Sequence, residues 1–188
     1  MVEKWEDWDL PDSVTINGNE YKFETDYRNI LKVMEPLNDP DLLDEEKIYC
    51  AFCLFYIESE KIKPDDIQEA MQSMMLFING NKNDTQKKQS KPLMDWEKDF
   101  SLIVAPINKA VGHDIRLDLM HWWTFLSYFM EIGECTFSTY VAIRNKKNKN
   151  TKLEKYEEEI YKNNIEAIKL KTKVDSTTQE MIDAILGK

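Results

Sequence analysis

The N-terminal part of the chain alternates between apolar and polar residues on both sides of a turn sequence. Val14 and Ile16 are separated by a polar residue before Asn17-Gly18, and Tyr21 and Phe23 are separated in the same way after it. Asn-Gly between alternating segments favours a two-residue hairpin turn, because both turn residues need positive φ angles. The pattern predicts a β-hairpin over 13–24. Such a hairpin must lie on a larger body, since a lone hairpin is marginally stable in water.

From residue 25 onward, the apolar positions recur at helical spacing. This spacing predicts a helix that is capped by Thr25 or Asp26 and stops before Pro36. It predicts further helices over 44–58, 65–77, 95–111, 117–132 and 136–144. A charged helical stretch with a sparse apolar stripe follows from 151 to about 171, and a last amphipathic segment covers 176–186. The stretch 48–58 is apolar on nearly every side, which predicts a central buried helix.

Composition supports the same fold class. The 188 residues include only five Gly and six Pro, which is few for the many tight turns of a sandwich or barrel. We therefore expect a mainly α protein: a bundle of about five to seven helices with a small N-terminal β-hairpin and a C-terminal helical arm. We divide it into a helical domain over 1–144 and a charged extension over 145–188.

The charge is unevenly distributed along the chain. The formal net charge of −10 equals that of residues 1–46 alone, whereas residues 144–188 carry a net charge of +3. A polarised chain suggests contacts with partners or with other copies of itself, although a solvated acidic face explains the same numbers. The sequence pI near 4.8 argues against nucleic-acid binding.

The sequence carries no signal-peptide pattern, and its longest apolar stretches are shorter than the roughly 20 residues that cross a bilayer as a helix. We therefore expect no membrane association. An odd number of cysteines, three, does not suggest a disulfide framework, so we expect a reducing cytoplasm.

Candidate chemistry is sparse. Cys50 and Cys53 have the spacing of a redox or zinc motif, but they lie inside an apolar helix and no second ligand pair exists, so we expect buried structural cysteines. His121 lies in an apolar helix, and His113 follows Gly112 at a predicted helix end, where a capping role is expected. No nucleophile elbow, phosphate loop or dinucleotide fingerprint occurs. We expect no metal, no cofactor and no enzymatic activity.

Adaptable binding surfaces are a stronger possibility. Nine methionines, several of them within 71–75 and 120–130, can pack against varied helices, although a Met-rich core accounts for them equally well. Trp5 and Trp8 form either a docking peptide or part of the core. The candidate partner-binding residues are these two tryptophans and the apolar stripe of the C-terminal part: Trp5, Trp8, Leu153, Tyr156, Ile160, Met181 and Ile185.

Three segments give the chain a resemblance to a known family. The first runs from Leu10 to Gly18 and continues through Tyr21–Arg28, the second is Trp96–Ile103, and the third is Leu119–Phe125 followed by a short helix that ends in Arg144. In this order they resemble the bacteriophage gene-product-fifteen family, whose opening hairpin, "tDfR" helix start and "fe.Da..I..aF" region they match. The His-Trp-Trp-x-Phe box at 121–125 is the most specific part. The likeness covers roughly 10–144, and 105–112 lacks the Phe and Tyr that the family usually has there.

The resemblance implies a role in assembling long non-contractile phage tails. It suggests a chaperone in the cytoplasm of the infected bacterial host that binds the tape-measure protein and tail proteins, with self-association also open. Alternatives are a structural tail component that stays in the virion and a small phage regulator that inhibits a host protein. Within the fold, we expect one aromatic group to lock the central helices, with two residues packed opposite the box: His121, Trp122, Trp123 and Phe125, with Trp96 and Phe100.

Overall fold

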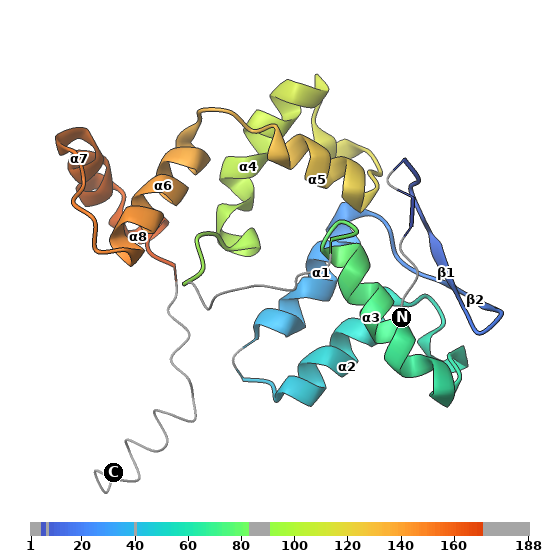
Figure 1. Cartoon of the computed structure of the whole chain (residues 1–188). Coiled ribbons are helices and arrows are strands. Elements are labelled where there is room, and N and C mark those ends of the chain that lie inside the picture. The colour runs from blue at the N-terminus through green and yellow to red at the C-terminus, as the bar shows by residue number, and fades with distance from the viewer. Residues whose placement is uncertain (1–4, 7, 40, 83–90, 171–188) are drawn as a thin grey trace, which may run out of the picture. The chain divides into compact units, whose positions relative to one another are not determined.

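The structure is a computed structural model that describes residues 5–6, 8–39, 41–82 and 91–170. Within these residues it contains eight α-helices and one two-stranded antiparallel sheet, so the expected mainly α class is confirmed (Figure 1). The chain forms two compact units. The described residues of the first unit fall within 5–82 and 120–124, and those of the second fall within 91–119 and 125–170.

The predicted hairpin is present at the start of the first unit. Strands β1 (Ser13–Ile16) and β2 (Asn19–Lys22) pair with Val14 opposite Tyr21. Asn17 and Gly18 both have positive φ angles, 50° and 77°, as the Asn-Gly signal predicts. Val14, Ile16 and Tyr21 on one face of the hairpin are buried. On the other face, Thr15, Glu20 and Lys22 are exposed.

Asp66 fastens this hairpin to the helices. Its carboxylate accepts hydrogen bonds from Asn17 Nδ2 at 2.7 Å, Asn19 Nδ2 at 3.1 Å and the Tyr21 hydroxyl at 2.6 Å. Together these donors, led by Tyr21, lower the pKa of the Asp66 carboxyl and keep it ionised. The hairpin thus gains from the helical body the support that it lacks alone.

Three helices complete the first unit: α1 (Tyr27–Asn38), α2 (Asp44–Phe55) and α3 (Ile67–Ile78). Short 3-10 helices at Ser59–Lys61 and Pro64–Asp66 lead from α2 to α3. Helices α1 and α2 pack side by side, and α3 lies next to α2 (Figure 1). The predicted stop before Pro36 was wrong. Near the end of a helix, a proline removes only one backbone hydrogen bond, so α1 continues to Asn38.

The second unit contains α4 (Trp96–Val111), a 3-10 helix (Ile115–Leu117), α6 (Thr136–Asn148), α7 (Lys155–Asn163) and α8 (Ile165–Ile168). Helix α5 (Trp122–Met130) begins in the first unit and continues into the second. One core cluster joins Tyr140 and Ile143 of α6 to Leu153 and Ile168.

Other helix boundaries also differ from the sequence prediction, among them the end of α2, which lies at Phe55 and not at 58. Helix α5 starts at Trp122 because residues 120–122 pair with 25–27 before it, and α6 continues past Arg144 to Asn148. The division into 1–144 and 145–188 remains a prediction, since residues 171–188 lie outside the described part.

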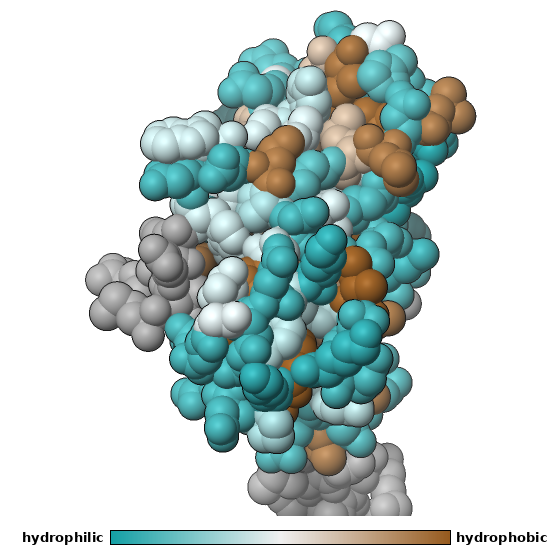
Figure 2. All heavy atoms as spheres, turned by 90° about the vertical axis from the view of Figure 1, so that its right-hand side faces the viewer, coloured by the Kyte–Doolittle hydropathy of each residue, from teal (hydrophilic) through white to brown (hydrophobic). Residues whose placement is uncertain are grey.

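The face drawn in Figure 2 is mainly hydrophilic, with apolar residues in scattered groups. Among the residues that the structure describes, no helix is both long enough and apolar enough to cross a membrane.

Candidate functional site

The segment before α5 lies against the start of α1. The Trp122 N–H donates to the Thr25 carbonyl at 2.7 Å. Asp26, the N-cap of α1, accepts hydrogen bonds at 3.0 Å from the backbone N–H of Arg28 and from that of Met120. Burial raises the pKa of the Asp26 carboxyl. The Arg28 guanidinium and the two backbone hydrogen bonds outweigh this effect, so the pKa lies below its ordinary value. Two segments that carry the family resemblance, Tyr21–Arg28 and Leu119–Phe125, therefore meet in space.

The two adjacent tryptophans cap the end of α3. Trp122 Nε1–H donates to the Ile78 carbonyl at 2.9 Å, and Trp123 Nε1–H donates to the Phe77 carbonyl at 2.9 Å. The last carbonyls of a helix have no partner inside the helix. Trp122 supplies a donor to the Ile78 carbonyl, and Trp123 adds a second donor to the Phe77 carbonyl, which also accepts from the Gly80 N–H at 3.0 Å. This arrangement explains why two consecutive indoles occur here.

His121 has both ring nitrogens engaged. Its Nδ1 lies 3.1 Å from the Trp123 backbone N–H, and its Nε2 lies 3.0 Å from the Pro11 carbonyl. A carbonyl only accepts and a backbone N–H only donates, so these contacts assign a neutral ring with the proton on Nε2. Burial lowers the pKa of His121 and outweighs the opposing effects of Pro11 and Asp12. The imidazole thus links the Pro11 carbonyl to the first turn of α5.

An aromatic cluster in the first unit contains Trp5. Its ring meets those of Phe23, Phe77 and Trp123 edge-on, with centroids 5.9, 6.1 and 5.9 Å away. Its Nε1–H donates to the Ser13 carbonyl at 3.2 Å. Of the two alternatives for this tryptophan, the structure shows packing onto the body.

The predicted aromatic group is divided between the two units. Trp96 packs against Phe125 and Phe129 of the second unit, with centroids 6.0 and 4.9 Å away. Phe125 is buried, and Phe100 on α4 is half-buried. His121, Trp122 and Trp123 instead belong to the first unit. The six residues are thus divided between the two units, because the chain passes from one unit to the other inside α5.

A buried ion pair holds the second unit together, and sequence reasoning did not single it out. Arg144 Nη1 and Nη2 lie 2.7 and 2.9 Å from Oδ2 and Oδ1 of Asp99, and the side chains are 5% and 0% exposed. Arg144 also donates to the carbonyls of Leu93, Ala167 and Ile168. All five N–H groups of the guanidinium therefore have acceptors.

The predicted partner-binding residues fall into three groups. Trp8 and Tyr156 are exposed, whereas Leu153 is buried in the core cluster and Ile160 packs against it. Trp5 is half-buried in its aromatic cluster. Met181 and Ile185 lie outside the described residues. Trp8 and Tyr156 are thus the residues of this set whose side chains are freely accessible to a partner.

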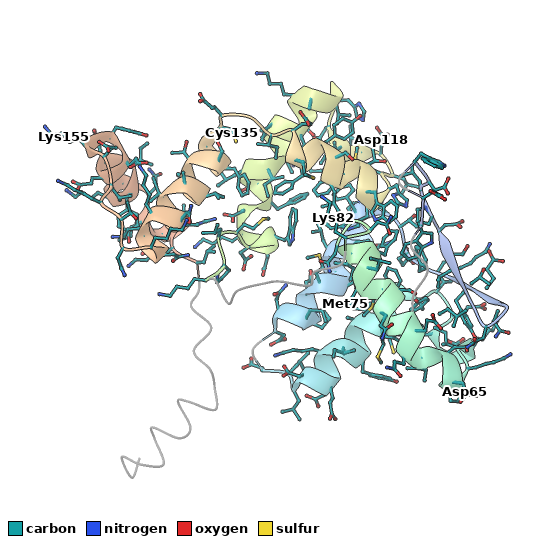
Figure 3. All side chains as sticks on the ribbon, in the orientation of Figure 1. Asp65, Met75, Lys82, Asp118, Cys135 and Lys155 are labelled. Atoms are coloured by element: carbon teal, nitrogen blue, oxygen red, sulfur yellow. The ribbon has the colours of Figure 1, made fainter. Side chains whose placement is uncertain are left out.

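The candidate chemistry residues are divided between the two units, with Cys50 and Cys53 on α2 of the first and His113 and Cys135 in the second. Cys53 is exposed and Cys50 half-buried, which corrects the expectation that both are buried, because they lie on the outer side of α2. Cys135 precedes α6 in the second unit (Figure 3). His113 forms an exposed contact of 2.9 Å with Asp118. Within the described residues, no group of three or more His, Cys, Asp or Glu side chains is placed to hold a metal ion.

A shallow basic recess of about 490 Å³ lies between α6 and α7. It is lined by Lys147, Lys152 and Lys162, with one acidic residue, Glu158. Lys147 Nζ lies 4.6 Å from the centroid of the Tyr161 ring, a cation–π contact. Three lysines against one glutamate give the recess a net positive charge.

The outer side of α2 carries several exposed apolar side chains. Tyr49, Leu54 and Ile57 are exposed there, while the opposite side of the helix is buried. The prediction of a helix buried on all sides was therefore wrong. The signal that could have exposed this error is the group of carboxylates at the start of the helix, since charged residues mark an end that reaches solvent.

These features define a mainly α protein. Its distinctive polar and aromatic residues link segments that are distant in the sequence, and apolar side chains of α2 are exposed. Residues 7–170 match the sequence model of the family described as Bacteriophage Gp15 protein. The chain belongs to this family and is a bacteriophage protein. Searches of curated proteins and of solved structures gave no match.

Proposed function

We propose that this phage protein is a tail assembly chaperone that binds the tape-measure protein in the host cytoplasm and assists polymerisation of the tail tube. It acts by binding and not as an enzyme. The observation that carries the proposal is the apolar outer side of α2 on a strongly acidic protein. A tape-measure protein must stay soluble before the tube encloses it. A partner that covers apolar helix faces and adds negative charge supplies that solubility.

The expected binding is of moderate strength per copy. Incoming tube subunits must displace the chaperone, and several weak contacts along one long helix hold it together while allowing stepwise release. Self-association along the tape measure would raise the effective concentration of each copy in the same way.

Co-expression with the tape-measure protein of the same phage tests the proposal. The expected result is a soluble complex that co-purifies, and a tape-measure protein that aggregates when expressed alone. Failure to co-purify, with the tape measure equally soluble in both cases, would contradict it.

Mass spectrometry of purified virions tests the main alternative. A chaperone is absent from mature particles, whereas a structural tail protein is present in stoichiometric amounts. Normal tails after deletion of the gene would instead favour the regulator of a host protein.

A further inference from the structure

Helix α2 carries apolar side chains on the side that faces away from the core. Tyr49, Leu54 and Ile57 are 65%, 49% and 58% exposed. Tyr49 and Cys53 are four residues apart, as are Cys50 and Leu54, so these residues share one helical face and Ile57 extends it just beyond the helix. We call Tyr49, Cys50, Cys53, Leu54 and Ile57 the outer α2 face.

The packing that holds the helix in place comes from its inner side and from the backbone. The inner side does this through Ala51, Phe52 and Phe55, which are buried, and the Phe55 ring stacks on Phe23 with centroids 4.8 Å apart. The backbone is fixed as well, because the Ile57 N–H donates to the Lys22 carbonyl at 3.1 Å. A rigid helix that presents apolar residues to solvent marks an interaction site.

Carboxylates gather at the start of this face. Asp44, Glu45 and Glu46 occupy the first turn of α2 and are exposed, and the one lysine beside them, Lys47, pairs with Asp44 at 3.2 Å. Beyond Ile57 the charges are balanced, because Glu58 pairs with Lys61 and Lys63 follows Glu60. A second copy packed in parallel would bring two acidic starts together, whereas basic residues of another helix complement this end.

We propose that the outer α2 face docks an amphipathic helix whose apolar stripe is flanked by Lys or Arg. The identity of that helix as a segment of the tape-measure protein rests on the function proposed above. Side by side with α2, such a helix covers Tyr49, Leu54 and Ile57 while its basic residues meet the acidic start of α2. The apolar contacts provide the affinity, and the charges set the position of the helix and reject acidic partners.

Two designed peptides test the chemistry of the surface. Both are 18-residue helices with the same Leu stripe, one flanked by Lys and the other by Glu. Fluorescence anisotropy with the full chain is expected to show that the Lys peptide binds at least about tenfold more tightly at low salt, and that this preference shrinks as salt is added. Equal binding of the two peptides would overturn the charge argument.

Matched variants locate the binding surface. The double variant Tyr49→Gln/Leu54→Gln keeps good helix formers in α2 and is expected to weaken binding of the Lys peptide about tenfold or more. Its control, Leu117→Gln/Leu119→Gln, changes residues that are 80% and 83% exposed in the second unit, and is expected to bind like the wild type. Circular dichroism verifies that both variants fold. Equal losses in both variants, or none in either, would overturn the location.

Cys53 provides a direct readout on the same face, because its thiol is exposed. In a Cys50→Ser/Cys135→Ser chain, bound Lys peptide is expected to slow modification of Cys53 by a maleimide at least severalfold. An unchanged rate at saturating peptide shows that the peptide binds elsewhere and overturns the proposal.

The co-expression experiment separates the two proposals. If the tape-measure protein co-purifies with wild-type and Tyr49→Gln/Leu54→Gln chains alike, the docking surface is wrong and the chaperone function stands. If the Lys peptide binds at α2 but the tape measure does not co-purify, the surface stands and the proposed function fails. If neither binds, both are wrong.

Discussion

Replacing Arg144 with methionine is expected to destabilise the second unit strongly. The substitution keeps a long side chain but removes all five N–H donors. It leaves the Asp99 carboxylate buried without its cation, with the Asp95 N–H still donating to it at 3.0 Å. Removing one member of a buried ion pair costs roughly 3–5 kcal/mol, because the other charge stays in a poorly solvated site. Arg144→Lys is expected to recover part of this loss, since an ammonium has three donors and cannot form the bidentate contact.

Native-state hydrogen exchange is the appropriate assay. The chain has two compact units, so a melting curve of the whole protein does not report on one two-state transition. Amides within α6 are expected to exchange faster by the factor that corresponds to the lost free energy, while those of α1 and α3 keep their protection.

A double variant separates the charge effect from lost packing. Asp99→Leu/Arg144→Met leaves no unpaired charge, so it is expected to be less destabilised than Arg144→Met alone. Two results would refute the reasoning. One is a loss of unfolding free energy below about 1 kcal/mol in Arg144→Met, and the other is a loss in the double variant equal to the sum of the losses in Asp99→Leu and Arg144→Met.

Three further predictions concern the first unit. Trp122→Phe removes the donor to the Ile78 carbonyl and is expected to cost about 1–3 kcal/mol, measured by exchange at the α3 amides. Burial holds the pKa of His121 below that of an unfolded chain, so its contribution to stability is complete above pH ~6.5 and is lost as the pH falls towards the folded pKa; His121→Gln is expected to flatten this slope in urea titrations. Asp66 has a lowered pKa, so its contribution is present above pH ~4 and is lost as the pH falls through the folded value. The Gly18 amide signal should report loosening of the hairpin in acid for the wild type, and at every pH for Asp66→Asn.

Local signals predicted most of the elements of this fold. Asn17-Gly18 fixed the hairpin register, because a two-residue turn admits one pairing, and the apolar spacing located the helices. The errors occurred where a distant partner decides the boundary. Helix α5 begins at Trp122 because the preceding residues pair with Thr25 and Asp26, nearly a hundred residues earlier. No local pattern contains that information.

Several residues in the segments that carry the family resemblance connect parts of the chain that are distant in the sequence. Asp26 and His121 lie in the two segments that meet in the first unit, and Asp99 and Arg144 pair in the second. Each pair joins segments that are 45 or more residues apart, so the roles of these residues become visible only when both partners are placed. Sequence spacing could single out the residue types but could not say which polar residues are buried together.

The apolar character of α2 had two physical explanations from the start. A helix that is hydrophobic on all sides is either enclosed by its own protein or covers one side with a partner, and periodicity does not distinguish these cases. The flanking charges do. Asp44, Glu45 and Glu46 cannot be buried without partners, so the start of α2 must reach solvent, and the outward residues Tyr49 and Leu54 then follow it into solvent. A surface of this kind lowers solubility unless a partner covers it, and the acidic start of α2 favours a basic partner there.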